Sequence, residues 1–300
     1  MYRRDLRHVR AVHDGSMRKR LVHLCVPLAL NDYLRSGLNT AEQLLIPYGL
    51  ARYAGSGTQA MAAYGTIHAM VFPILMFPSA VLFSLTDLLV PEFSRARAMG
   101  RRLRVADLTD KCLRLCMLFA AGTAGILFVC ADELGMWLYQ STEAGYYLKL
   151  FAPMVLMLYL DAIVDGMLKG LAEQVSCVRY NTATSLLDVL LLLMLLPRWG
   201  IGGYVFSFAV THGINLYLSL RRLCKVSRHR VKWRTLCAPV LCLGISVPLS
   251  YVAPTGLTRT ILFSALLCAC FCLCDAFPQR DRRWLNQVLR AGFGRNSTRT

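Results

Sequence analysis

The sequence predicts an all-α bundle of about eight membrane-spanning helices, and three observations support this fold class. The chain is 56% hydrophobic and 17% charged, whereas a soluble domain carries about a quarter charged residues. Its apolar stretches reach or approach the roughly 20 residues that a helix needs to cross a ~30 Å hydrocarbon core. Its basic residues also fall almost entirely into alternate connections between these stretches.

Eight apolar stretches follow one another along the chain. They cover residues 21–50, 60–88, 112–130, 147–168, 180–196, 203–220, 236–252 and 260–276. The basic Met1–Arg20 segment before the first stretch is unlike a signal peptide, because that stretch contains polar and charged residues and no small-residue cleavage site ends it. We expect a mature helix preceded by a cytoplasmic segment.

The basic residues predict the orientation of the bundle. Of 34 Lys and Arg residues, 29 lie in the segments 1–20, 91–114, 169–179, 221–234 and 279–300. Arg35 lies inside the first stretch, and the other connections hold Arg52, Lys149, Arg198 and Arg259. The positive-inside bias therefore predicts a multi-pass protein of the cytoplasmic membrane with both termini in the cytoplasm. The net charge of +17 faces anionic lipid in short loops, so nucleic-acid binding is not expected.

The first stretch carries a broad polar stripe. Asn31, Arg35, Asn39 and Gln43 recur every four residues, and Asp32, Ser36 and Thr40 form the adjacent row, with Glu42 close by. Charged groups at membrane depth cost at least ~2.5 kcal/mol each. The stripe is therefore expected to line a water-filled cavity, or alternatively to form a buried network in which Asp32 pairs with Arg35.

Prolines and acidic residues mark the next stretches. Pro73 and Pro78 predict a bent second helix, which is either flexible or fixed by packing. A basic loop is expected over Phe93–Thr109, with a short helical start at Ser94–Met99. Asp161, Asp165 and Lys169 share one face of the fourth helix, and Asp188 lies in the fifth.

Carboxylates inside membrane helices are typical of proton relays, ion sites or partners for cations. Asp161, Asp165 and Asp188 are therefore candidates for proton or ion coupling, and Arg35 is the expected partner of one of them. The alternative is a set of carboxylates that merely fixes helix packing. The sixth stretch adds Thr211, His212 and Asn215, of which His212 is expected to be a packing group.

The last two stretches are nearly featureless, which is typical of peripheral or lipid-facing helices. Four cysteines alternate at positions 268, 270, 272 and 274. Residues two apart on a helix point in nearly opposite directions, so these thiols are expected to pack as small apolar groups and to bind no metal. No cofactor and no enzymatic centre are expected, because no catalytic or phosphate-binding motif is found.

Four short segments carry a resemblance to a known family. They are Arg35–Pro47 (RSGLNTAEQLLIP), Ala63–Gly65 (AYG), Phe77–Ser79 (FPS) and Leu89–Ser94 (LVPEFS). The chain resembles the stage V sporulation protein B group, in the polysaccharide-exporter branch of the multidrug/oligosaccharidyl-lipid/polysaccharide exporter superfamily. The similarity is most specific over residues 21–100. Tyr2–Asp5 resembles the loop that joins the two lobes of such proteins.

The resemblance implies a lipid-linked saccharide flippase that works by alternating access between two lobes. It implies that residues 21–223 form the second, six-helix lobe, followed by two further helices at 224–276 and a basic tail at 277–300. The first lobe would come from a separate chain or be missing. Arg35, Asp32, Asn31, Asn39, Glu42 and Gln43 would line the substrate cavity. The alternatives are a cation-coupled multidrug exporter and a non-transporting remnant or partner subunit.

Overall fold

The computed structural model describes residues 15–53, 57–228, 233–253 and 256–273. Every regular element in these ranges is helical, so the all-α prediction is confirmed for them. The elements are α1 (Gly15–Ala51), α2 (Gly57–Thr66), α3 (Phe72–Met76), α4 (Ser79–Ala98), α5 (Arg102–Val129), α6 (Ala131–Tyr139), α7 (Thr142–Phe151), α8 (Val155–Gly170), α9 (Gln174–Trp199), α10 (Ile201–Ser227), α11 (Trp233–Ser250) and α12 (Gly256–Leu273).

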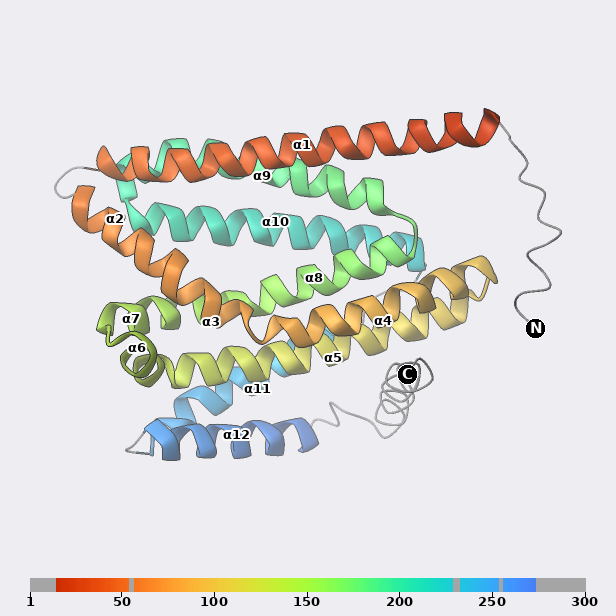
Figure 1. The fold of residues 1–300 in the computed structure, drawn as a ribbon. Helices are drawn as coiled ribbons and strands as arrows, with labels where there is room; N and C mark the ends of the chain where they lie inside the picture. The colour runs from red at the N-terminus through yellow and green to blue at the C-terminus, as the bar shows by residue number, and fades with distance from the viewer. Residues whose placement is uncertain (1–14, 54–56, 229–232, 254–255, 274–300) are drawn as a thin grey trace, which may run out of the picture.

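The long helices run back and forth between two ends of the bundle (Figure 1). The connections at 99–101 and 171–173 and the C-terminus of α10 share one end, which we call the basic end because Arg101, Arg102, Lys169 and Arg222 lie at or near these connections. The α6–α7 hairpin and the turn at Gly200 lie at the other end, which we call the opposite end. The charge sorting in the sequence thus corresponds to the two ends of the bundle.

Four segments of the described chain are long and apolar enough to cross a membrane. They are Gly57–Met76, Arg102–Val129, Thr142–Gly170 and Gln174–Trp199. The helices α1 and α10 have 37 and 27 residues but are not among these four. The protein is therefore a membrane protein by helix length and composition, while the count of eight spans and their orientation remain predictions.

The second predicted stretch is divided into several elements. A π-helical turn at Ile67–Val71 separates α2 from α3, and Phe77 and Pro78 separate α3 from α4. Pro78 has no N–H to continue the helical ladder, so the backbone bonds restart with Ala80 and Val81 donating to Phe77 and Pro78. Pro91, in contrast, lies inside α4. The expected bend is present, together with a π-helical turn that the prolines alone did not predict.

The prediction of a basic loop over Phe93–Thr109 is wrong. α4 continues to Ala98 and α5 begins at Arg102, so the two helices form a hairpin with a three-residue turn. Gly100 has φ +65°, and the Gly100 and Arg101 N–H groups donate to the Arg97 and Ala96 carbonyls. This Schellman cap ends α4 without a long loop. The arginines lie on helical ends because Arg is a good helix former.

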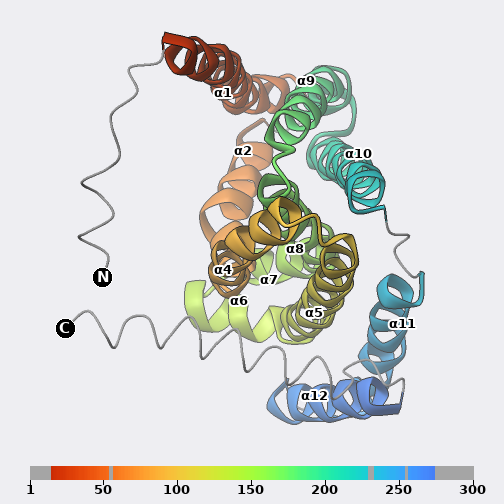
Figure 2. The ribbon, with the colours of Figure 1, turned by 90° about the vertical axis from the view of Figure 1, so that its right-hand side faces the viewer.

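Two hydrophobic clusters divide the core. The larger one joins α1 through α10 and includes Leu50, Phe93 and Tyr159, each no more than 1% exposed. The smaller one joins Val129 of α5 to Cys242, Phe263 and Leu267 of α11 and α12. Figure 2 shows α11 and α12 to one side of the other helices, next to α5. The last two described helices therefore pack as a pair on α5.

Gly125 of α5 allows this pair to pack closely, which gives a stability prediction. A Cβ at Gly125 would overlap the Phe263 ring and lie 2.8 Å from Leu243, whereas a Cβ at Gly122 would meet its nearest atom, in Leu267, at 3.9 Å. We expect Gly125→Ala to lower the free energy of unfolding by about 1–3 kcal/mol. Gly122→Ala, the matched control, should not destabilise. Thermal unfolding in detergent measures both, and equal Tm values would contradict this packing.

Cysteine labelling in cells tests the orientation. In a background without reactive cysteines, Gly100→Cys and Arg228→Cys at the basic end should react with impermeant maleimide only after the membrane is opened. Thr142→Cys at the opposite end should react in intact cells, because the basic end is expected to face the cytoplasm. Labelling of Thr142→Cys from the cytoplasm alone would reject the eight-span topology.

Candidate functional site

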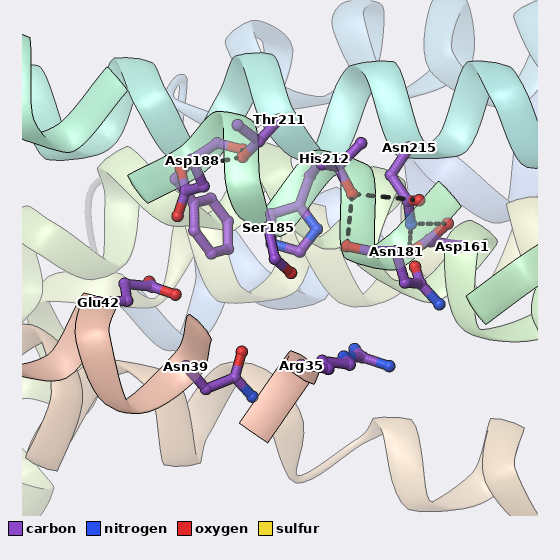
Figure 3. A pocket seen from close by; sticks show the side chains of 12 residues that line it. Arg35, Asn39, Glu42, Asp161, Asn181, Ser185, Asp188, Thr211, His212 and Asn215 are labelled. Atoms are coloured by element: carbon purple, nitrogen blue, oxygen red, sulfur yellow. Dashed lines mark hydrogen bonds between the residues drawn. The ribbon is translucent and has the colours of Figure 1, made fainter. Parts of the chain in front are cut away.

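A polar cavity of about 160 Å³ lies among α1, α8, α9 and α10. In Figure 3, α1 side chains lie across from those of the other three helices. The lining residues are Arg35, Asn39, Glu42, Asp161, Asn181, Thr184, Ser185, Asp188, Phe208, Thr211, His212 and Asn215. One guanidinium and three carboxylates therefore line a single space inside a bundle of apolar helices.

α1 brings three of its predicted site residues to the cavity. Arg35, Asn39 and Glu42 are spaced by four and three residues, which places them on one face of a helix. Arg35 and Asn39 are exposed, whereas Glu42 is partly buried and interacts electrostatically with Asp188. The cavity is thus open toward the Arg35 side and more enclosed toward the carboxylates.

Asp161 of α8 is held by α10. Asn215 donates from Nδ2 to both oxygens of Asp161, at 3.0 and 2.8 Å, and its own Oδ1 lies 3.5 Å from the Thr184 hydroxyl. Asn215 is 4% exposed. Because two donor contacts converge on one carboxylate, Asp161 is fixed in the cavity wall although it lies within an apolar helix.

Asp188 of α9 is held by two hydroxyl groups of α10. Ser207 donates to its Oδ1 at 2.6 Å, and the Thr211 hydroxyl lies 3.2 Å from the same atom and 2.9 Å from the Ser207 carbonyl oxygen. Both hydroxyls are buried. On the cavity side, Glu42 lies opposite Asp188 (Figure 3) and interacts with its carboxylate. Asp188 and Glu42 are therefore suited to share a proton or a monovalent cation.

Asp165 is near the cavity but does not line it. Its Oδ2 accepts a hydrogen bond from Asn181 at 3.0 Å, and its Oδ1 lies 3.5 Å from the Ser219 hydroxyl. Asp165 is one helical turn from Asp161 toward the basic end. The three acidic residues suggested by the sequence lie on α8 and α9. All three contact the same polar face of α10, at different positions along that helix.

The structure does not support every predicted contact. Arg35 forms no salt bridge within 4.0 Å with Asp161, Asp165 or Asp188, although its charge acts on Asp161. The predicted ion pair between Arg35 and one of these carboxylates is therefore absent. Gln43 is exposed and does not line the cavity. Asn31 and Asp32 lie in α1, but their side chains are outside the described residues.

Sequence reasoning missed several residues of this site. Asn181, Thr184 and Ser185 of α9 line the cavity, and Ser207 and Ser219 of α10 hold carboxylates. A pattern in the sequence could have identified the α10 residues, because polar side chains recur there every four residues, at Ser207, Thr211, Asn215 and Ser219. His212, which the sequence suggested was a packing group, lines the cavity and also contacts the Phe208 ring.

Over the described part of the chain, no three His, Cys, Asp or Glu side chains are arranged to hold a metal ion. Cys268 and Cys272 are exposed free thiols and Cys270 is partly buried, while Cys274 lies outside the described residues.

An ion pair at the basic end joins the turn between α8 and α9 to α10, and we call it the clamp. Arg222 donates from Nε and Nη2 to Glu173 Oε2, at 3.0 and 2.6 Å, and Ser176 donates to the same oxygen. Burial alone would raise the pKa of the Glu173 carboxyl, but these hydrogen bonds outweigh burial and hold that pKa below its usual value. The clamp fixes the turn in which Ala172 has φ +52°.

Two curated proteins of Bacillus subtilis (strain 168) are similar to this chain. Stage V sporulation protein B is 26% identical over 175 residues, which cover 58% of this chain and 34% of that protein. Sporulation protein YkvU is 26% identical over 173 residues, covering 56% and 39% of the two chains. The chain is a relative of these sporulation proteins. The predicted resemblance is thus confirmed.

The matched segment spans little more than a third of either relative. No protein-family model matches the chain. The assignment of this segment to a particular lobe of a flippase stays a prediction.

The clamp at the basic end predicts a pH-dependent contribution to stability. The folded-state pKa of Glu173 lies below the unfolded value of about 4.3. Its stabilisation is therefore complete above about pH 4.3 and is lost as the pH falls through the folded-state pKa. Glu173→Gln should lower stability at pH 7 by roughly 1–2 kcal/mol. The difference from wild type should shrink below about pH 4.

Thermal unfolding of both proteins across this pH range measures the effect. Glu143→Gln, at an exposed position of α7, is the matched control. A wild-type minus Glu173→Gln difference that stays constant from neutral to acid pH would contradict the role assigned to this carboxylate.

Proposed function

We propose that this protein is one lobe of a flippase-like transporter that moves a lipid-linked saccharide across the cytoplasmic membrane. The observation that carries the proposal is the charged cavity among α1, α8, α9 and α10, in a chain related to sporulation proteins of the stage V sporulation protein B type. Charged groups inside membrane helices are costly and usually functional. A transporter is the class of protein that requires such a cavity.

In this proposal, Arg35 binds the anionic part of the cargo. Its guanidinium lies on the exposed side of the cavity and forms no salt bridge with the carboxylates of the site. A planar fork of donors can bind two oxygens of a pyrophosphate at once. The lipid chain of the cargo would remain in the bilayer beside α1.

The carboxylates suggest a second ligand, a coupling cation. Glu42, Asp161 and Asp188 outnumber Arg35 in the cavity lining, so the empty site attracts positive charge. A proton or a monovalent cation bound between Glu42 and Asp188 would reduce the repulsion that an incoming pyrophosphate meets. Cargo binding at Arg35 and cation binding at the carboxylates would then favour each other.

The same excess of carboxylates favours a second candidate function, a cation-coupled multidrug exporter. In that case an organic cation would occupy the space between Asp161 and Asp188, and Arg35 would be dispensable. Binding of tetraphenylphosphonium to the purified protein, abolished by Asp188→Asn and unchanged in Arg35→Ala, would favour the exporter.

A partner lobe belongs to the proposal. Arg35, Asn39 and Gln43 are exposed on α1, as is expected of a polar stripe that faces an open groove. Polar side chains at membrane depth need shielding from lipid, and a first lobe would supply it. If a separate chain supplies this lobe, it would cover the groove. Its co-expression should then raise the level of this protein.

The Arg35 prediction tests the function directly. The probe is a polyprenyl-pyrophosphate-linked disaccharide added to the purified protein in detergent, with binding measured by thermophoresis. Loss of a hydrogen-bonded charge pair is worth about 1.5–3 kcal/mol, so Arg35→Ala should weaken binding by roughly ten- to a hundredfold. Arg35→Lys should restore part of the affinity, because lysine keeps the charge without the fork.

Arg52→Ala is the matched control, since Arg52 follows directly after the C-terminus of α1, away from the cavity lining, and stacks on Tyr48. Unfolding temperatures establish that all variants are folded. Equal binding by wild type, Arg35→Ala and Arg52→Ala would reject the proposed role of Arg35 and, with it, the saccharide as cargo of this cavity.

A further inference from the structure

One face of α10 carries five polar side chains in succession. Tyr204, Ser207, Thr211, Asn215 and Ser219 are separated by three, four, four and four residues, so they form a single stripe along the helix. All five are buried, with exposed fractions of 5% or less. From Tyr204 to Ser219 the stripe rises by 15 residue steps, about 22 Å along the helix, which is most of a ~30 Å hydrocarbon core.

Each member of this stripe is paired with a titratable side chain of a neighbouring helix. Nearest the opposite end, the Tyr204 hydroxyl lies 3.1 Å from Nε2 of His68. Ser207 and Thr211 both bond to Asp188, Asn215 bonds to Asp161, and Ser219 lies within 3.5 Å of Asp165. The four partners come from three different segments, namely the π-helical turn after α2, α9 and α8.

We infer that the face of α10 from Tyr204 to Ser219, with His68, Asp188, Asp161 and Asp165, is a proton pathway through this lobe. Serine, threonine and tyrosine hydroxyls donate and accept at once, so each can take up a proton on one side and release its own on the other. The transfer moves protons between oxygen and nitrogen atoms and changes no oxidation state. The inference rests on the proposed transporter, whose cycle such a pathway would drive.

The cavity lies between two of the acidic groups of this series, Asp188 and Asp161. Both residues line it, and its volume of about 160 Å³ leaves room for water. Water there can connect Asp188 to Asp161, where asparagine by itself is a poor relay. From Asp161 the next acidic group is Asp165, one helical turn further toward the basic end.

The series of paired groups ends at an exposed side chain on each side. His68 is exposed and lies in the π-helical turn Ile67–Val71, a local structure that is rare and frequently functional. Tyr204 is one turn from the start of α10. At the basic end, Asp165 is one turn from Lys169, which is exposed. In the proposed pathway, protons enter at His68, which lies inside the membrane-length segment Gly57–Met76, and leave beside Lys169.

Other charged and titratable groups face this series and set its electrostatics. From α1, Glu42 interacts with Asp188 and Tyr204, and Arg35 with Asp161. From α10 itself, His212 interacts with Asp188. Two further groups contribute, since Tyr64 of α2 interacts with Tyr204 and Cys177 of α9 with Asp165.

Packing alone does not explain why the partners are titratable. Neutral amide or hydroxyl partners would satisfy the same α10 side chains without placing three carboxylates in apolar helices, where each charge is costly. A pathway for protons needs groups that bind and release them, and the successive partners of the stripe have this property.

Proton flux into proteoliposomes tests the inference. The full chain is reconstituted without cargo, a pH-sensitive dye is enclosed, and valinomycin with a potassium gradient drives protons inward in sodium-free buffer. Wild type should acidify the lumen faster than empty liposomes do. Asp188→Asn and Asp161→Asn should reduce the flux to the empty-liposome rate, and Tyr204→Phe should reduce it severalfold, because it removes the hydroxyl that bridges to His68.

Matched controls use the same chemical changes away from the stripe. Asp132→Asn and Tyr146→Phe alter exposed positions near the opposite end and should leave the flux unchanged. Thermal unfolding identifies any variant that fails to fold. If one carboxylate variant fails, Asp165→Asn and Tyr204→Phe keep the test decisive, since the inference requires both to slow the flux.

Three outcomes would overturn the inference. They are a wild-type flux equal to that of empty liposomes, a flux that persists in Asp188→Asn and Asp161→Asn, and a flux that requires sodium. Saccharide binding through Arg35 is measured separately. Proton flux without Arg35-dependent binding would therefore reject the saccharide proposal alone, and binding without proton flux would reject the pathway alone.

Discussion

The structure depends on one constraint, which is that a carboxylate placed inside a membrane helix must have partners within the protein. Asp161, Asp165 and Asp188 lie in helices that lipid would otherwise surround, where an isolated charge is costly. Each is bonded by a side chain of α10. These bonds fix the rotation of α10 about its axis and bring α8 and α9 against it. The cavity is the space that these three helices leave beside α1.

The α10 stripe also explains a division of roles among the helices. α8, α9 and α10 hold the buried polar pairs, while α1 presents Arg35 on an exposed surface. α11 and α12 contribute no lining residue to the described cavity and pack through Phe263 against α5. A site with a partly buried acidic wall and an exposed basic rim can bind a cation and an anion at separate positions. This separation suits coupled transport.

The two ends of the bundle differ in chemistry. At the basic end, the Glu173–Arg222 clamp fixes the short turn between α8 and α9. At the opposite end, the α6–α7 hairpin exposes Trp137 and Tyr146, and amphipathic aromatic side chains favour the membrane–water interface. Lys149 and Asp132 form an ion pair across this hairpin. The orientation of the two ends in the membrane stays a prediction, which labelling can establish.

The sequence by itself determined the class of fold and the chemistry of the site. Apolar stretches of membrane length, alternating basic connections and the spacing of Arg35 and Asn39 are local properties, because helical periodicity places residues three or four apart on one face. The same reasoning identified Asp161, Asp165 and Asp188 as unusual. It failed at Phe93–Thr109, where the density of arginines suggested a loop although arginine favours helices.

Only the tertiary structure decided which polar residues meet. The sequence suggested that Arg35 would pair with a carboxylate, but the carboxylates bond to Ser207, Thr211 and Asn215 instead. Periodicity gives the face on which a residue lies, but not the neighbour that this face meets. That neighbour is set by packing among helices far apart in the chain, such as α10 against α8 and α9. The cavity and the α10 stripe with its partners are consequences of that packing.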